Sequence, residues 1–320
     1  MSPINFLCGS KLMSATDQDQ KRHNQQYQNM LSRFTKILVI GLGQLGLPVI
    51  KYVKERGFDT YGYDINTKAI DRAEKIAEIK PAFDFGNEDF DVFIISVSTH
   101  QPDDMFSPQI EGLLSIVNKI SKEAKKDGAL ISIESTIPKG TSKKVYEILN
   151  HRLHVVHVPH RWYALEEKEH GVNQIRVIGG VCDCCLRAGM RFYSGTEEET
   201  YFDTTPNSYN SLRIPMRPVS NIEIAEITKV VENAHRYLQI AFAEELYLYC
   251  QANNINFPEL RDALNTKWNV NILEPREGIG GHCLPKDTKM FLQSSNERKS
   301  KILTSAMEVD EDYRRSHYAM

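Results

Sequence analysis

The chain has 320 residues, of which 41% are hydrophobic, and this length is typical of two domains with separate cores. Its 39 basic and 42 acidic residues give a net charge of -3, which excludes the basic surface expected of a nucleic-acid-binding protein. No apolar run reaches the roughly 18 residues of a membrane helix, and no signal-peptide pattern opens the chain. We therefore expect a cytoplasmic protein that binds neither nucleic acid nor membranes.

The six cysteines are unevenly spaced and do not form the framework of a small disulfide-rich protein. Three of them cluster at Cys182, Cys184 and Cys185, but no further cysteine or histidine pair follows at ligand spacing. The sequence therefore predicts no metal site, and we interpret the cluster as the start of a helix.

Residues 1 to about 33 are polar and carry no sustained apolar period, which predicts a mobile tail. From residue 34 to about 210, short apolar runs alternate with helical patterns. This alternation is typical of an α/β fold with a Rossmann-type, doubly wound parallel sheet. The runs expected as strands cover residues 36–40, 59–63, 91–97, 129–133, 154–158 and 175–179.

A glycine-rich turn follows the first of these runs and leads into a helical pattern. In a dinucleotide-binding fold, such glycines make the tight turn, admit the pyrophosphate against the backbone and let helix and strand pack closely. The second strand ends at Asp64, where a carboxylate bonds the adenosine ribose hydroxyls and repels a 2′-phosphate. This favours NAD over NADP as the cofactor. It also favours a dinucleotide-binding site over an ordinary glycine turn before a helix. The residues expected to bind it are Gly41, Gly43, Gln44, Leu45, Gly46 and Asp64.

Residues 194–211 show no core pattern and are expected to form an exposed linker. From Asn221 to about Ala252, apolar residues recur at helical spacing over a length that is unusual within one globular domain, which predicts packing against a partner. Lys229 and Asn233 are four residues apart and share one face of this helix. A solvated, salt-bridged face would give the same pattern.

A glycine-rich run surrounds Cys283 with a histidine, a lysine and an aspartate. Pro285 is a natural first residue of a helix, so the thiol would lie at the positive helix end, where the thiolate is favoured. His282 and Lys286 would add positive charge, and Asp287 would lie about one turn below the sulfur. This pattern indicates covalent catalysis, and the alternative is an inert, buried cysteine in a glycine-rich turn.

Together these motifs resemble the UDP-glucose/GDP-mannose dehydrogenase family, most closely its UDP-N-acetylmannosamine dehydrogenase branch. The likeness runs from about residue 34 to the C-terminus. Further matches follow in the family's order: VSTH at 97–100 resembles its Val-Pro-Thr-Pro turn, ESTIPKGT at 134–141 its Ser-Thr-x-Pro-x-Gly-Thr loop, RVIGG at 176–180 its strand end, and Glu226, Lys229, Asn233 and Arg236 its E-x-x-K-x-x-x-N-x-x-R helix.

The resemblance implies NAD-dependent oxidation of a UDP- or GDP-hexose at C6, from alcohol to carboxylate, as in polysaccharide biosynthesis. Cys283 would carry first a thiohemiacetal and then a thioester. Lys229 and Asn233 would stabilise the oxyanions, and Asp287 would transfer protons with a water that Thr136 positions.

The resemblance also implies that Thr99 and Thr136 contact the cofactor and that the helix from Asn221 forms a homodimer. On this basis we expect an NAD-binding Rossmann domain at residues 34–210, followed by an α-helical dimerisation and catalytic domain at residues 211–320.

Two departures from the family pattern matter. His160 stands where the family has a glutamate associated with thioester hydrolysis, although an imidazole can act as a base near neutral pH. Ile302 to His317 resembles the helix that leads into a third, nucleotide-binding domain, which we expect to be lacking or to be supplied by a second polypeptide. Three hypotheses about the function remain. The chain is an active dehydrogenase of unidentified sugar specificity, or a catalytically silent NAD-binding subunit that regulates a full-length partner. The third hypothesis is a two-electron hydroxy-acid dehydrogenase in which Cys283 has no role.

Overall fold

The computed structural model describes residues 34–101, 103–162, 166, 168, 170–196, 210–294 and 300–318. The chain divides into two compact units. The first comprises the residues up to Thr99 and Ile110–Glu226, and the second comprises His100–Gln109 and the residues from Ile227 onwards. The tail expected at residues 1–33 and most of the linker expected at residues 194–211 lie outside the described residues.

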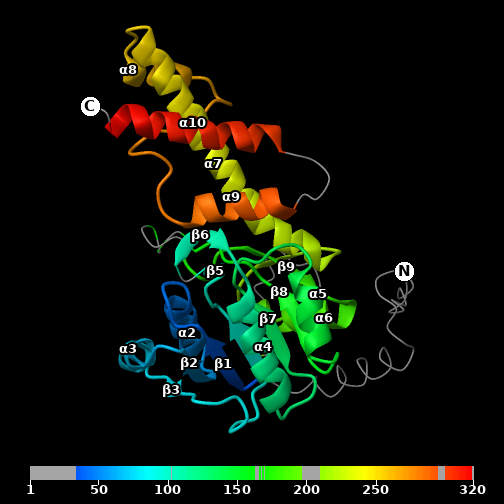
Figure 1. Cartoon of the computed structure of the whole chain (residues 1–320). Helices are drawn as coiled ribbons and strands as arrows, with labels where there is room; N and C mark the ends of the chain where they lie inside the picture. The colour runs from blue at the N-terminus through cyan, green and yellow to red at the C-terminus, as the bar shows by residue number, and fades with distance from the viewer. Residues whose placement is uncertain are drawn as a thin grey trace. The chain divides into compact units, whose positions relative to one another are not determined.

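The first unit is built on a sheet with the strand order β10-β9-β8-β7-β4-β1-β2-β3 (Figure 1). Neighbouring strands are parallel except β8 and β9, which pair antiparallel. The α/β class and the Rossmann-type sheet are therefore confirmed, and all the predicted strands are present. The bounds are β1 Lys36–Ile40, β2 Asp59–Tyr63, β3 Lys80–Pro81, β4 Val92–Ile95, β7 Leu130–Ile133, β8 His154–His157, β9 Arg176–Gly180 and β10 Met216–Pro218.

The expectation that every strand of the sheet is parallel is wrong at β9. Parallel neighbours need a crossover connection, usually a helix, and the described residues between His157 and Arg176 contain no α-helix. β9 therefore returns beside β8 in the opposite direction, with Val156 paired to Gly180. The short strands β3 and β10, of two and three residues, carry too few side chains to give an apolar period.

Helices cover both faces of this sheet (Figure 1). Side chains alternate along β1, so Ile37 and Val39 pack with α2, α3 and α6, whereas Leu38 and Ile40 pack with α4 and α5. Because both faces are covered, the strands are apolar runs without a polar side. The helix bounds are α2 Gly46–Glu55, α3 Thr67–Ala77, α4 Glu111–Glu123, α5 Thr141–Ile148 and α6 Asp183–Tyr193.

The second unit is helical. It contains α7 from Ile227 onwards and a small core in which Tyr237, Ala241 and Ala306 surround Ile279. None of the described helices is long and apolar enough to cross a membrane. The bounds are α7 Ile222–Ala252, α8 Phe257–Leu264, α9 Cys283–Ser294 and α10 Lys301–Tyr318, with a hairpin of β5 His100–Gln101 and β6 Asp104–Pro108.

Candidate active site

The glycine turn between β1 and α2 has the geometry of a dinucleotide site. Gly41 has a φ of +89°, in the left-handed region that favours glycine. A Cβ at Gly46 would lie 1.7 Å from the Gly41 carbonyl oxygen, so only glycine lets α2 begin against the turn. A Cβ at Gly43 would meet nothing within 4 Å, which leaves open space where a pyrophosphate approaches the backbone. The residues present therefore fit a dinucleotide.

Asp64 closes this turn from the end of β2. Its Oδ2 accepts a hydrogen bond from the Leu42 amide at 2.7 Å, and its Oδ1 accepts one from the Asn66 amide at 2.8 Å. Gln44 is exposed beside the turn, and Leu45 is half-buried at the N-cap of α2. The carboxylate is thus held beside the glycine turn, where this fold binds the adenosine ribose.

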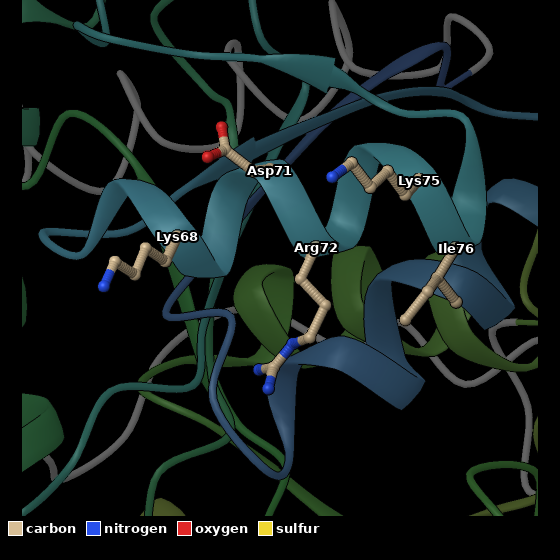
Figure 2. Close-up of a pocket in the computed structure, with 5 residues that line it drawn as sticks. All are labelled: Lys68, Asp71, Arg72, Lys75 and Ile76. Carbon is tan, nitrogen blue, oxygen red and sulfur yellow. The ribbon is translucent and has the colours of Figure 1, made fainter.

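Arg72 of α3 supports the same turn. Figure 2 shows its side chain reaching away from α3, beside a hollow that Lys68 and Lys75 also line. The Arg72 Nη2 donates a hydrogen bond to the Leu42 carbonyl oxygen at 3.0 Å. Nothing in the local sequence pattern of α3 indicates this contact with the turn.

Two loops at the same edge of the sheet are tied to each other. The Thr99 Oγ1 donates a hydrogen bond to the Thr136 carbonyl oxygen at 2.8 Å, and the Ser135 Oγ donates one to the Val97 carbonyl oxygen at 2.7 Å. These loops follow β4 and β7, which run parallel to β1. Both threonines expected to contact the cofactor therefore lie at the carboxyl ends of strands, where such sheets bind ligands.

Glu226 positions the loop that carries Thr136. Its carboxylate accepts hydrogen bonds from the Gly140 amide at 2.6 Å and from the Ser142 amide at 2.7 Å, at the N-terminus of α5. Burial raises the pKa of Glu226, and the two amides oppose this shift. Although Glu226 matches the motif of the family helix, its partners lie more than 80 residues away, so no local signal could assign this contact.

His160 belongs to a buried polar network in the first unit. Its Nε2 lies 2.5 Å from Glu134 Oε2 and 3.1 Å from Arg176 Nη1. Arg176 and the Tyr193 hydroxyl also donate hydrogen bonds to Glu134 Oε1, at 3.0 and 2.5 Å. Burial alone would raise the pKa of Glu134, but Arg176 and His160 overcome it and lower the pKa to about 2. The imidazole is thus engaged with a buried carboxylate.

In the second unit, α7 and α9 bring together several predicted catalytic residues. The Asp287 Oδ2 accepts a hydrogen bond from Asn233 Nδ2 at 2.5 Å, and its Oδ1 accepts one from Lys286 Nζ at 2.5 Å. Both Asp287 and Lys286 are buried. Lys229, one turn before Asn233 on α7, is close enough to Cys283 to lower the pKa of its thiol.

Cys283 is the first residue of α9, so its thiol lies at a helix N-terminus as predicted, although Pro285 is the third helical residue rather than the first. The side chain is exposed. Partial desolvation raises the pKa of the Cys283 thiol, and Asp287 raises it further, against the opposing effect of nearby lysines. The expectation that this site favours the thiolate is therefore wrong, because desolvation outweighs the positive charges.

His282 also differs from its expected role. Burial lowers the pKa of His282, and His100, whose ring centroid is 5.7 Å away, lowers it further together with Lys286. The expectation that His282 adds positive charge is therefore wrong. A neutral imidazole whose Nε2 lies 3.7 Å from the Cys283 Sγ can instead accept the thiol proton.

Helix α10 anchors the glycine-rich loop before Cys283. The Asp310 Oδ1 accepts a hydrogen bond from the Ile279 amide at 2.8 Å, and the Arg314 Nη2 donates one to the Ile279 carbonyl oxygen at 2.8 Å. The Arg314 Nε also donates to Asp310 Oδ1 at 3.1 Å. Ile279 is buried, so the loop is fixed by packing and by its backbone hydrogen bonds. No local sequence pattern indicates these contacts of Asp310 and Arg314.

Two family models match this chain. Residues 78–196 match the NAD binding domain of the UDP-glucose/GDP-mannose dehydrogenase family, and residues 223–312 match its central domain. The UDP-N-acetyl-D-mannosamine dehydrogenase of Methanococcus maripaludis is 31% identical over 297 residues, which cover 87% of this chain and 65% of that protein. The enzyme of the same name from Campylobacter jejuni is 30% identical over 314 residues, which cover 88% and 73%.

The chain thus spans about 65% of the length of the Methanococcus relative. The solved structure of the UDP-D-ManNAc dehydrogenase from Pyrococcus horikoshii matches it with a TM-score of 0.72 and 26% identity, over 87% of this chain and 69% of that one. The glycine turn fits a dinucleotide and the NAD binding domain matches, so the cofactor is NAD. The chain belongs to the UDP-glucose/GDP-mannose dehydrogenase family.

Proposed function

We propose that this chain is an NAD-dependent nucleotide-sugar 6-dehydrogenase, which oxidises the C6 alcohol of a UDP- or GDP-hexose to a carboxylate. One arrangement of side chains on α7 and α9 carries the proposal. Asn233 and Lys286 donate hydrogen bonds to the carboxylate of Asp287, and Asp287 lies in the helix that begins at Cys283. Bound NAD supplies a hydride acceptor for each of two oxidation steps. Two relatives are named UDP-N-acetyl-D-mannosamine dehydrogenases, so this sugar's nucleotide is the first substrate to test.

Cys283 makes the second oxidation possible. The alcohol first loses a hydride and a proton, which leaves an aldehyde. The thiol then adds across the aldehyde, its sulfur to carbon and its proton to oxygen, and gives a thiohemiacetal. Loss of a second hydride and a proton leaves a thioester, which water cleaves to the acid and the free thiol.

The neighbouring residues of the second unit serve this chemistry. The neutral His282 accepts the thiol proton, since its Nε2 lies 3.7 Å from the sulfur, and passes it to the oxygen of the aldehyde as the sulfur adds. Lys229 and the Asn233 amide act as donors toward oxyanions. Asp287, fixed by two hydrogen bonds, is the proton acceptor for the attacking water.

The direct test is NADH production by the purified chain with a panel of UDP- and GDP-sugars. A four-electron oxidation yields two NADH for each acid formed, whereas a two-electron hydroxy-acid dehydrogenase yields one. A two-to-one ratio with any nucleotide sugar supports the proposal. A chain that binds NAD but forms no NADH from any sugar of the panel contradicts it.

A second function is favoured by one observation. His160, in place of the family's glutamate, is bonded to Glu134 and Arg176 inside the first unit. This engagement favours a catalytically silent NAD-binding subunit that dimerises with or regulates a full-length dehydrogenase. Co-purification with such an enzyme, together with a change in that enzyme's activity, would support this alternative.

Asp64 should determine the choice of cofactor, and Asp64→Ala should lose the preference for NAD over NADP. The carboxylate accepts hydrogen bonds from the ribose hydroxyls and opposes a 2′-phosphate, and hydrogen bonds to charged groups contribute about 1.5–3 kcal/mol, or roughly ten- to a hundredfold in affinity. Calorimetric titration with both nucleotides measures the change. Asp71→Ala, on the exposed surface of α3, is the matched control. An unchanged NAD preference in Asp64→Ala would count against the assignment.

Exposed apolar side chains follow one stripe of α7 in the second unit. Val231, Phe242 and Tyr249 are 39%, 55% and 56% exposed, and they are separated by eleven and seven residues, about three and about two helical turns. A groove beside Phe242 is also lined by Ile302 and Ala306 of α10. Such a face is typical of an interaction site, and we assign it to a second copy of the chain in a two-fold dimer.

Phe242→Glu should convert a dimer into a monomer, because a charge in a desolvated apolar interface has no compensating partner. Size-exclusion chromatography with light scattering at micromolar concentration measures the mass. Phe83→Glu, at a position that is 73% exposed in the first unit, should leave the dimer intact. A wild-type chain that is monomeric under these conditions would defeat the proposed dimer.

A further inference from the structure

The first unit contains a cluster of three thiols and one imidazole outside the sites described above. The Cys182 Sγ lies 2.8 Å from the Cys184 Sγ and 3.3 Å from the Cys185 Sγ. The Cys185 Sγ lies 3.6 Å from the His154 Nδ1. One ligand atom each from His154, Cys184 and Cys185 lies within 4.8 Å of the others, and all three residues are buried. We call these four residues the thiol cluster.

The antiparallel return of β9 assembles this cluster. β9 ends at Gly180 beside β8, and α6 begins three residues later at Asp183. A Cβ at Gly180 would lie 2.4 Å from the Leu186 amide nitrogen and 2.8 Å from the Cys182 carbonyl oxygen, so glycine lets the turn close tightly. The turn thereby brings the three cysteines to His154, the first residue of β8. His154 is 28 residues away from Cys182 in the sequence, which is why spacing alone gave no fourth ligand.

We propose that the thiol cluster binds one thiophilic metal ion in tetrahedral coordination, with Zn²⁺ as the divalent ion of this class. Three sulfurs and one imidazole nitrogen are a complete ligand set for structural zinc. Tetrahedral bonds of about 2.3 Å place two sulfurs about 3.8 Å apart. The Cys182 sulfur is 2.8 and 3.3 Å from the other two sulfurs, and the ligand atoms of His154, Cys184 and Cys185 all lie within 4.8 Å of one another, so side-chain rotations can bring the four to one ion.

Two local contacts offset part of the unfavourable burial of the negative charge that bound thiolates carry. The Val155 amide donates a hydrogen bond to the Cys185 Sγ at 3.3 Å. Cys182 is the N-cap of α6 and Cys184 is in its first turn, so the positive end of the helix faces the sulfurs. Binding releases one proton from each thiol that becomes a ligand. Cys182 is half-buried, which gives the ion a route from solvent.

The position of the cluster indicates a structural role. β1, β4, β7 and β8 are parallel, so His154 lies at their amino ends, whereas Gly41 follows the carboxyl end of β1. The cluster and the cofactor turn therefore lie at opposite ends of the parallel strands. With four protein ligands the coordination sphere is closed, which leaves no position for substrate. The ion would join the start of β8 to the start of α6.

The test is metal binding by the full chain, reduced, stripped of metal with a chelator and titrated with Co²⁺ as a spectroscopic probe. Tetrahedral thiolate coordination gives intense visible bands and a sulfur-to-cobalt charge-transfer band, both of which one equivalent of Zn²⁺ should abolish. The freshly isolated chain should contain about one zinc per chain by elemental analysis. Zn²⁺ should also raise its melting temperature, because the ion binds the folded state.

Cys182→Ser is the sharpest variant, because serine is a preferred N-cap and keeps the start of α6 while removing one ligand. It should lose most of the charge-transfer intensity and the stabilisation by Zn²⁺. Cys250→Ser, at a buried thiol of α7, and Cys283→Ser, at the exposed thiol of α9, should keep both. Absence of tetrahedral bands in the reduced wild type, unchanged bands in Cys182→Ser, or a metal-free chain isolated with a disulfide within the cluster would each overturn the proposal.

Discussion

Cys283→Ser should bind NAD normally and form no carboxylate product, with a loss of at least about a thousandfold in acid formation. A serine hydroxyl stays protonated near neutral pH and is a weaker nucleophile, so the aldehyde is no longer trapped on the enzyme. Acid formation is measured by chromatography beside NADH release, and NAD affinity by calorimetry. The control is Cys250→Ser, whose thiol is buried in α7 away from the α9 N-terminus and should leave turnover unchanged.

The thiol itself should show a specific pattern of reactivity. Cys283 is exposed whereas Cys184, Cys185 and Cys250 are buried, so brief iodoacetamide treatment should alkylate it before these three. Because desolvation and Asp287 raise the pKa of Cys283, its thiolate fraction and its alkylation rate should still be rising at pH values where an ordinary thiol has levelled off. Mass spectrometry ranks the sites. Full turnover in Cys283→Ser, or a Cys283 no more reactive than Cys250, would end the covalent mechanism.

The parts of the fold that the sequence predicted correctly depend on local pattern. The apolar run at β1, the glycine turn after it and Asp64 at the end of β2 lie within 29 residues, and each has a backbone requirement that only certain residues meet. The long helix α7 was likewise visible from its period. The position of Cys283 at a helix N-terminus followed from the proline beside it, although the helix begins two residues earlier than Pro285.

What the sequence could not provide depends on distant contacts. The direction of β9 follows from the lack of a crossover helix among the described residues before it, and this reversal brings His154 to the cysteines. The thiolate expected at Cys283 and the positive charge expected at His282 leave out desolvation, which raises the pKa of the thiol and lowers the pKa of the imidazole. Glu226 gave no local signal of its hydrogen bonds to the start of α5.

Glu134→Gln should destabilise the first unit by about 3–5 kcal/mol at neutral pH, because removing one charge of a buried pair leaves the other uncompensated. Arg176 is 1% exposed and pairs with this carboxylate at 3.0 Å, while His160 and Tyr193 also bond it. Glutamine keeps the shape of the side chain, so the loss measures charge rather than a cavity. Urea unfolding of both proteins gives the difference in the free energy of unfolding. Glu223→Gln, which breaks a partly exposed pair with Lys143, should cost about 1 kcal/mol or less.

The pH dependence distinguishes an ionised Glu134 from a merely well-packed one. The folded pKa of Glu134 is lowered to about 2, below the unfolded value of about 4.3, so ionisation stabilises the fold fully above the unfolded value. That contribution, about 3 kcal/mol from a shift of more than two units, should decline as pH falls from about 4.3 toward 2. The gap in unfolding free energy between wild type and Glu134→Gln should therefore narrow as the pH falls through this window. A gap that is equally large at pH 3 would mean that the carboxyl group acts through neutral hydrogen bonds, and that the charge of Arg176 is balanced by another group.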